Sequence, residues 1–183
     1  MNMKVIRLTK TAFDIMFVVG VIGIVLVAGL TVLSPIIVDA IRESNGLATS
    51  GNFFGVPVSF DLSEMDSGTV AQVAYAAGFG IIVSMGVGTY IAHQIRRALR
   101  AVLGGSAFRD ENYERLRKVA YAAFVLVPMG WITNSWITTV VDGSFSLKID
   151  IPFTTIAGGL LALAVAEIYK AGITLQDESE LTV

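Results

Sequence analysis

Ionisable side chains inside apolar segments are the residues of this sequence whose position could support chemistry. Asp14 and Glu167 are two such carboxylates, and each lies about one helical turn from the end of an apolar stretch. Because a charge in hydrocarbon is costly, these carboxylates either pair with cations such as Lys10 and Lys170 or mark a path for protons or cations. Asn134 lies deeper in its own stretch, and we expect it to form a hydrogen bond to another helix.

Several other classes of chemistry are excluded by composition. The sequence has no cysteine and a single histidine, His93. Thiolate nucleophiles, disulfides and cysteine-ligated metal centres are therefore impossible, and no histidine pair is available for a metal. The remaining carboxylates and hydroxyls are scattered without the paired geometry of an active site. We therefore expect a protein that is not an enzyme and that holds no cofactor and no metal.

The elements that position these residues are four apolar stretches. They cover residues 12–37, 70–92, 119–141 and 153–168, and the last is the shortest. A helix needs about 20 mostly apolar residues to cross a bilayer. With 54% hydrophobic and 15% charged residues, the 183-residue chain is too apolar for an ordinary soluble domain. The sequence predicts an all-α integral membrane fold, with four transmembrane helices in a single domain over residues 1–183.

The basic residues test this interpretation independently. They gather before the first stretch, in the 93–118 loop and just after the fourth stretch, whereas only Arg42 and Lys148 lie in the other two loops. Cytoplasmic loops collect Lys and Arg, so we expect a multi-pass protein with both termini in the cytoplasm. A cleaved signal peptide remains an alternative for the first stretch, although its apolar run is longer than the about 7–15 residues of a signal core.

The two outward loops, residues 39–69 and 142–152, contain alternating apolar residues. The alternating positions are Val56, Val58, Phe60 and Leu62 in the first loop and Phe145, Leu147, Ile149 and Ile151 in the second. This period of two predicts two strands that pair as a small extracytoplasmic β cap, either a sensor or a purely structural cover. The glycines at 46, 51 and 55 predict a loop before the first strand. The acids Asp61, Glu64 and Asp66 lack the spacing of a calcium loop.

Small residues recur on one face of the second stretch. These are Ala76, Gly80, Ser84, Gly88 and Ala92. Small side chains let helix backbones approach each other in lipid. A shorter set, Gly158, Ala162 and Ala166, lies in the fourth stretch. The sequence predicts contact between the second and fourth helices or, alternatively, between chains of a homo-oligomer.

The 93–118 loop is basic, and its first part has the spacing of an amphipathic helix that continues the second stretch to Gly104. Asp110 is then expected to cap the next helix, and Gly172 to end the last one before a solvated acidic tail over 172–183. Two interpretations stay open for this surface: attraction to anionic lipid headgroups, and docking of a cytosolic protein. Direct nucleic-acid binding is not expected. The candidate docking residues are Arg96, Arg97, Arg100, Phe108, Arg115, Arg117, Leu175 and Leu181.

Two segments of the sequence carry a family resemblance. The first joins residues 108–112 with 115–117, and the second includes 166–169, Gly172, 175–178 and 181–183. In these residues the chain resembles an uncharacterised bacterial four-helix membrane family, catalogued as domain of unknown function 2975. The resemblance implies a bacterial cytoplasmic-membrane protein. Members of that family are often encoded beside small helix-turn-helix regulators, which implies a transcription factor as the partner.

Two functions remain open from the sequence. One is a non-enzymatic membrane regulator or anchor that holds a cytosolic partner through the basic loop and the tail. The other is a small oligomeric transporter or channel, with a pathway near Asp14 and Glu167 or along the small-residue face of the second helix.

Overall fold

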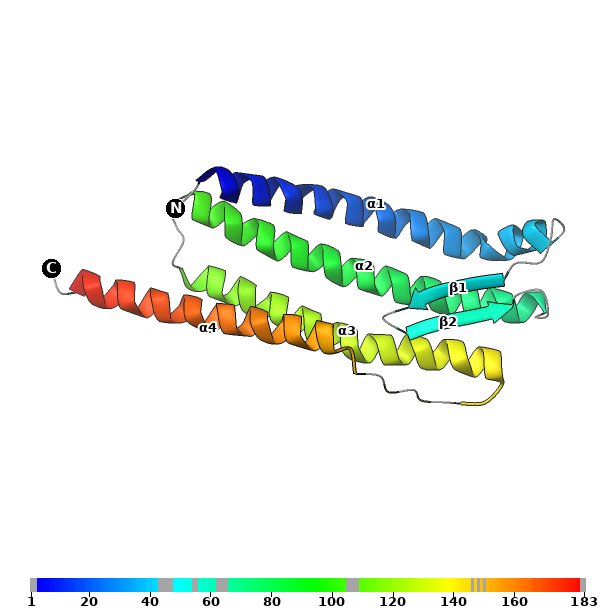
Figure 1. Cartoon of the computed structure of the whole chain (residues 1–183). Coiled ribbons are helices and arrows are strands. Elements are labelled where there is room, and N and C mark those ends of the chain that lie inside the picture. Colours follow the sequence, from blue (N-terminus) through cyan, green and yellow to red (C-terminus); the bar gives the residue numbers. More distant parts are fainter. Residues whose placement is uncertain are drawn as a thin grey trace. The chain divides into compact units, whose positions relative to one another are not determined.

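Long apolar helices form most of the structure, which is a computed structural model (Figure 1). It describes the backbone of residues 3–42, 48–53, 56–61, 66–104, 109–145, 147, 149 and 151–181, and the side chains of all these except 38–42, 48–53, 56–61 and 179–181. The helices are α1 (Met3–Arg42), α2 (Ser67–Leu103), α3 (Asp110–Asp142) and α4 (Phe153–Leu181). All four are long and apolar enough to span a membrane. The predicted helical class with four candidate spans is therefore confirmed.

Two helix ends differ from the sequence predictions. At the start of α3 the N–H of Asn112 donates to the backbone carbonyl of Arg109 at 2.9 Å, so the residue that precedes the helix is Arg109 and not Asp110. Helix α4 does not end at Gly172 but continues to Leu181. Ile173 follows the glycine and is packed with Tyr113, and this tertiary contact outweighs the cost of about 1 kcal/mol for glycine inside a helix. By contrast, α2 ends at Leu103, directly before the predicted stop.

The strands also pair differently from the predicted β cap. β1 (Ala48–Phe53) and β2 (Val56–Asp61) form an antiparallel hairpin, with Phe53 opposite Val56. The partner of β2 is thus the segment predicted as a loop. In the second outward loop, the described residues 142–145, 147, 149 and 151–152 contain no strand, so a cap built from both loops is not supported. Closing a short connection costs less chain entropy than pairing segments far apart in sequence.

The chain divides into two compact units, which we describe separately. Unit 2 comprises residues 22–85 and 127–152. Its core contains Val73 and Ala76 of α2 packed with Ile137 of α3. The rings of Phe79 and Trp136 lie 6.1 Å apart, also between α2 and α3. Unit 1 comprises residues 1–21, 86–126 and 153–183, and its core contains Tyr113 of α3 packed with Ala166 and Ile173 of α4.

The predicted small-residue face of α2 is only partly buried. Ala76 and Ala92 are buried, whereas Gly88 is exposed. Gly80 is buried and Ser84 half-buried. Contact of this face with α4 stays a prediction.

The close approach of α1 and α2 uses other glycines. A Cβ on Gly78 of α2 would overlap the side chain of Thr31 of α1, and in unit 1 a Cβ on Gly20 of α1 would overlap Thr89 of α2. A glycine is therefore required on α1 at one contact and on α2 at the other. A period-four pattern along a single helix does not reveal this arrangement.

Replacing Gly78 by alanine should therefore destabilise the fold. We expect Gly78→Ala to lower the free energy of unfolding by about 1–3 kcal/mol, because the added methyl must displace Thr31. Gly86→Ala is the matched control, since a Cβ there has nothing within 4 Å, and higher helix propensity should leave it neutral or slightly stabilised. Unfolding in detergent, followed by circular dichroism, measures both. Equal stability of the two variants would contradict the close contact.

Asp66 caps the start of α2. Its carboxylate accepts the N–H of Thr69 at 3.1 Å and also the Thr69 hydroxyl, and its backbone carbonyl accepts the N–H of Val70 at 3.1 Å. The hydrogen bonds from Thr69 lower the pKa of Asp66 from its ordinary value of 3.8. This outward acid therefore satisfies free donors at a helix end.

The cap gives the stability a defined pH dependence. Because the pKa of Asp66 is lower in the folded chain, its stabilising contribution is present above the ordinary pKa of 3.8 and is lost as the pH falls through the folded value. We expect Asp66→Ala to lower the Tm by about 2–4 °C at neutral pH and the difference from the parent protein to shrink in acid. Thermal unfolding across pH measures this, with Asp110→Ala as the control. A Tm difference between Asp66→Ala and the parent protein that persists in strong acid would refute the stabilising role of the Asp66 carboxylate at the start of α2.

Candidate functional site

The first polar contact region joins α3 to α4, and we call it the α3–α4 junction. Tyr113 is buried and its hydroxyl donates to Glu167 Oε1 at 3.1 Å. Asn112 is also buried, and its Nδ2 donates to the hydroxyl of Tyr169 at 3.3 Å. Each α4 residue in these contacts lies close to Ala166, which packs against Tyr113. The junction thus combines an apolar contact with two hydrogen bonds between helices.

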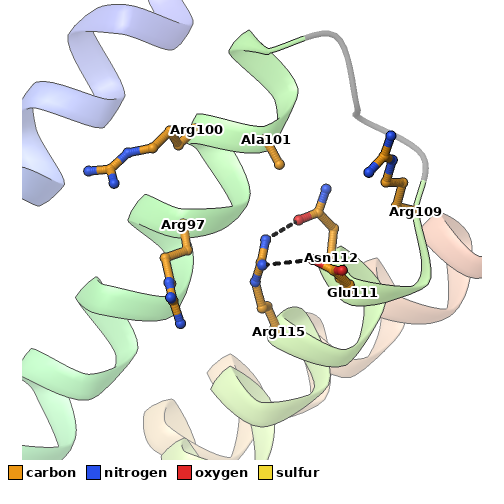
Figure 2. Close-up of a pocket in the computed structure, with 7 residues that line it drawn as sticks. All are labelled: Arg97, Arg100, Ala101, Arg109, Glu111, Asn112 and Arg115. Carbon is orange, nitrogen blue, oxygen red and sulfur yellow. Dashed lines mark hydrogen bonds and ion pairs between the residues drawn. The ribbon is translucent and has the colours of Figure 1, made fainter.

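Asn112 also orients an arginine. Arg115 Nη1 donates to Asn112 Oδ1 at 2.8 Å, and Arg115 Nη2 lies 3.1 Å from Glu111 Oε2 (Figure 2). The amide of Asn112 therefore accepts a hydrogen bond from its own helix and donates one to α4. Since the amide is 2% exposed, it holds Arg115 in one orientation.

The second contact region joins α1 to α2, and we call it the α1–α2 junction. Asp14 lies 2.6 Å from Lys10 Nζ and 3.5 Å from Arg96 Nε. The guanidinium of Arg96 lies 4.3 Å from the centre of the Phe17 ring. Its Nη2 lies 3.2 Å from Nδ1 of His93. Because arginine only donates, Nδ1 is the acceptor in this contact, and the histidine takes part in side-chain packing.

A cavity of about 260 Å³ lies where the end of α2 meets the start of α3 (Figure 2). Its lining consists of Arg97, Arg100, Ala101, Arg109, Glu111, Asn112 and Arg115. The four arginines and one glutamate give this lining a formal charge of +3. We call it the arginine cavity.

The predicted docking residues separate into groups. Arg97, Arg100 and Arg115 line the arginine cavity, whereas Arg96 belongs to the α1–α2 junction. Arg117 lies outside the cavity lining and contacts Glu114 at 3.6 Å and the hydroxyl of Tyr121 at 3.0 Å.

The remaining docking candidates are Leu175, Phe108 and Leu181, and Leu175 is outside the cavity lining. Leu175 is 67% exposed. Phe108 lies outside the described residues, as does the side chain of Leu181.

The predicted intramembrane polar residues have different surroundings. Asp14 pairs with Lys10 as expected, while Glu167 accepts a hydrogen bond from Tyr113 and has no ion pair with a cation of the described residues. Asn134 is buried, but its Oδ1 has no hydrogen-bond partner in the described part of the chain, so the expected bond to another helix is not found there. Its neighbours Thr133 and Ser135 are also buried, and their hydroxyls have no hydrogen-bond partner among the described residues.

Sequence reasoning predicted Arg115 but missed Glu111 and Asn112, which orient it in the cavity lining. The spacing of Glu111, Asn112 and Arg115 along one helix is a visible signal, because residues three and four apart share a face. The partner Tyr169 belongs to another helix, 57 residues away, and nothing local indicates it. Within the described residues there is no group of three or more His, Cys, Asp or Glu that could hold a metal ion.

Comparison with known proteins identifies one family. Residues 56–183 match the model of a family described as "Protein of unknown function (DUF2975)". The matched segment includes β2, α2, α3 and α4, and with them the α3–α4 junction and the arginine cavity. No curated protein and no solved structure matches the chain.

Removing the amide of Asn112 should loosen the α3–α4 junction. We expect Asn112→Ala to lower the free energy of unfolding by about 1–3 kcal/mol, because it leaves Arg115 and Tyr169 without their shared partner. Glu114→Ala, on the exposed side of the same turn, should change stability by less than about 0.5 kcal/mol.

A double-mutant cycle of Asn112→Ala with Tyr169→Phe isolates the contact. If the effects of these two substitutions were strictly additive, the bond between the helices would contribute nothing to stability.

Proposed function

The chain belongs to the DUF2975 family of proteins of unknown function, and we propose that it is a non-enzymatic membrane protein that anchors or regulates a cytosolic partner. Its proposed location is the bacterial cytoplasmic membrane, which the chain crosses four times with both termini in the cytoplasm. The partner is a regulatory protein such as a helix-turn-helix transcription factor. The chain itself makes no direct contact with nucleic acid.

The distribution of charge supports this orientation. Unit 1 contains the basic start of α1, the basic end of α2 and the start of α3. Helix α2 has 37 residues and α3 has 33, so they are about 55 and 50 Å long. The hydrocarbon core of a bilayer is only about 30 Å thick. This excess length supports a placement of the arginine-bearing ends in the cytoplasmic headgroups and water.

The observation that carries the proposal is the helical continuation of α4 beyond the α3–α4 junction. Ile173 is buried against Tyr113, whereas Leu175 is exposed on the same helix and is followed by the exposed acids Asp177 and Glu178. A helix that is fixed at one end and presents an exposed leucine beside charged residues suits a protein partner, because little entropy is lost when it binds.

The ionisable groups of the two junctions support a non-enzymatic role. Asp14 is engaged by Lys10 and Arg96, and Glu167 accepts the hydroxyl of Tyr113. Their contacts are those of groups that position helices.

A second candidate function, a small oligomeric transporter or channel, is favoured by a different observation. Thr133, Asn134 and Ser135 are buried in α3, and one polar side-chain atom of each has no hydrogen-bond partner in the described residues. Unsatisfied polar atoms inside a membrane helix are costly and often adjoin a polar pathway. This function predicts flux that depends on Asn134.

Substitution at Leu175 tests the anchoring function. We expect Leu175→Ser to reduce recovery of the partner about tenfold after gentle extraction from the native membrane, because an apolar contact is lost from an exposed helix. Thr174→Ser is the control, since serine retains the hydroxyl that bonds to the carbonyl of Lys170. Quantitative mass spectrometry measures the recovery, and the purified partner must bind back to the protein in nanodiscs.

The outcomes separate the two functions. A cytosolic protein that rebinds the parent chain and not the Leu175→Ser variant supports anchoring. A homo-oligomer with no cytosolic protein, unaffected by Leu175→Ser, together with ion or solute flux abolished by Asn134→Leu, would instead establish the transporter.

A further inference from the structure

The arginine cavity has an excess of positive charge that the acidic side chains of the described residues do not fully pair. Of its arginines, Arg115 is paired with Glu111. Arg97 and Arg109 also line the cavity, and neither has an acidic partner within 4.0 Å among the described residues. Like charges gathered around a cavity repel one another, and a bound anion removes that repulsion. The cavity is thus suited to an anionic ligand.

The arginines come from two helices. Arg97 and Arg100 belong to α2 and Arg109 and Arg115 to the start of α3 (Figure 2). The Arg100 side chain extends toward the α1 side of α2 in this view, away from Arg115. Guanidinium groups offer several N–H donors in a plane, a geometry that matches the oxygens of phosphate.

One donor is held in place before any ligand binds. Arg115 is fixed by Asn112 and Glu111, and Asn112 is itself buried and bonded to Tyr169 of α4. A preorganised donor loses less conformational entropy when a ligand binds. The buried amide therefore fixes the position of one donor, Arg115, in a cavity lining that also contains Arg97 and Arg109.

The depth of the cavity indicates the source of the phosphate. Arg97 follows the last residue of the predicted second span, Ala92, by five residues, and Arg115 precedes the first residue of the third, Val119, by four. These separations correspond to about 7.5 and 6 Å of helix. The headgroup layer on each side of a bilayer is about 5–8 Å thick. By this reckoning Arg97 and Arg115 fall at the level of lipid phosphates, and Arg109 lies farther toward water.

We propose that the arginine cavity binds a phosphate group, supplied by the headgroup of an anionic phospholipid. Its volume of about 260 Å³ is below the about 300–1,000 Å³ of sites for drug-sized ligands, which suits a phosphate with a small headgroup. This site is separate from the exposed Leu175 surface and requires no cytosolic partner. The protein would then bind one specific membrane lipid at the start of α3.

Native mass spectrometry of the full chain in a neutral detergent tests the site. The probes are phosphatidylglycerol, phosphatidylcholine as the uncharged lipid, and inorganic phosphate. The test variant is Arg97→Gln/Arg109→Gln, and the charge-matched control is Arg7→Gln/Lys118→Gln, because both control residues are exposed and lie outside the cavity lining. We expect one phosphatidylglycerol per chain, with affinity about tenfold or more weaker in the test variant and unchanged in the control.

Two further measurements complete the test. Thermal unfolding verifies that both variants are folded, and competition by inorganic phosphate against chloride at equal ionic strength tests the parent protein without any substitution. Displacement of phosphatidylglycerol by phosphate supports a phosphate site. Binding of inorganic phosphate without retention of phosphatidylglycerol overturns the lipid source and assigns a soluble phosphate. Equal lipid retention in the test and control variants, or equal retention of phosphatidylglycerol and phosphatidylcholine, overturns the site.

Discussion

A polar group placed in hydrocarbon must find its hydrogen-bond partner within the protein, and the rest of this structure follows from that constraint. The backbone satisfies it by forming helices, which account for every candidate span. The side chains largely satisfy it by position, because charged residues gather near helix ends. Where polar residues join helices, as Asn112 joins Tyr169 and Tyr113 joins Glu167, the contacts are hydrogen-bonded and accompanied by apolar packing. The two junctions of unit 1 lie at or beyond the ends of the predicted spans, and there hydrogen bonds or ion pairs combine with packing to join the helices.

Features that depend on local composition could be predicted from the sequence. The four helices, the end of α2 at Leu103 and the pair of Lys10 with Asp14 all follow from hydropathy, glycine positions and spacing along one helix. The misses depend on tertiary contacts. The strand partner of β2 and the continuation of α4 past Gly172 are decided by neighbours that a linear pattern does not contain. The same holds for Gly78. A side chain at this position would overlap Thr31 of another helix, which the local sequence does not reveal.

The candidate site shows the same limit at finer scale. Arg96 and Arg97 are adjacent, and the sequence predicts one basic surface for them, yet Arg96 faces Asp14 and Phe17 while Arg97 lines the arginine cavity. Successive residues of a helix differ by about 100° in direction, so a cluster of arginines in sequence becomes two surfaces with different roles. In the sequence Asn112 is only part of a family pattern, because its role depends on Tyr169 of α4. Residue type thus predicts the chemistry of the surface, and tertiary packing decides how it is divided.

The division of polar groups between the two units keeps the functional alternatives physically distinct. In unit 1 Asp14 engages Lys10 and Glu167 accepts a tyrosine hydroxyl, while Arg97 and Arg109 are among the cations with no acidic partner in the described residues. Such a region has the charge that the proposed phosphate site requires. In unit 2 the unpartnered atoms of the described chain include the neutral ones of Thr133, Asn134 and Ser135. Neutral oxygens can coordinate a passing ion or water without attracting a soluble protein. The two proposed functions, anchoring and transport, therefore invoke different residues of this chain, and a substitution in one unit need not alter the chemistry available in the other.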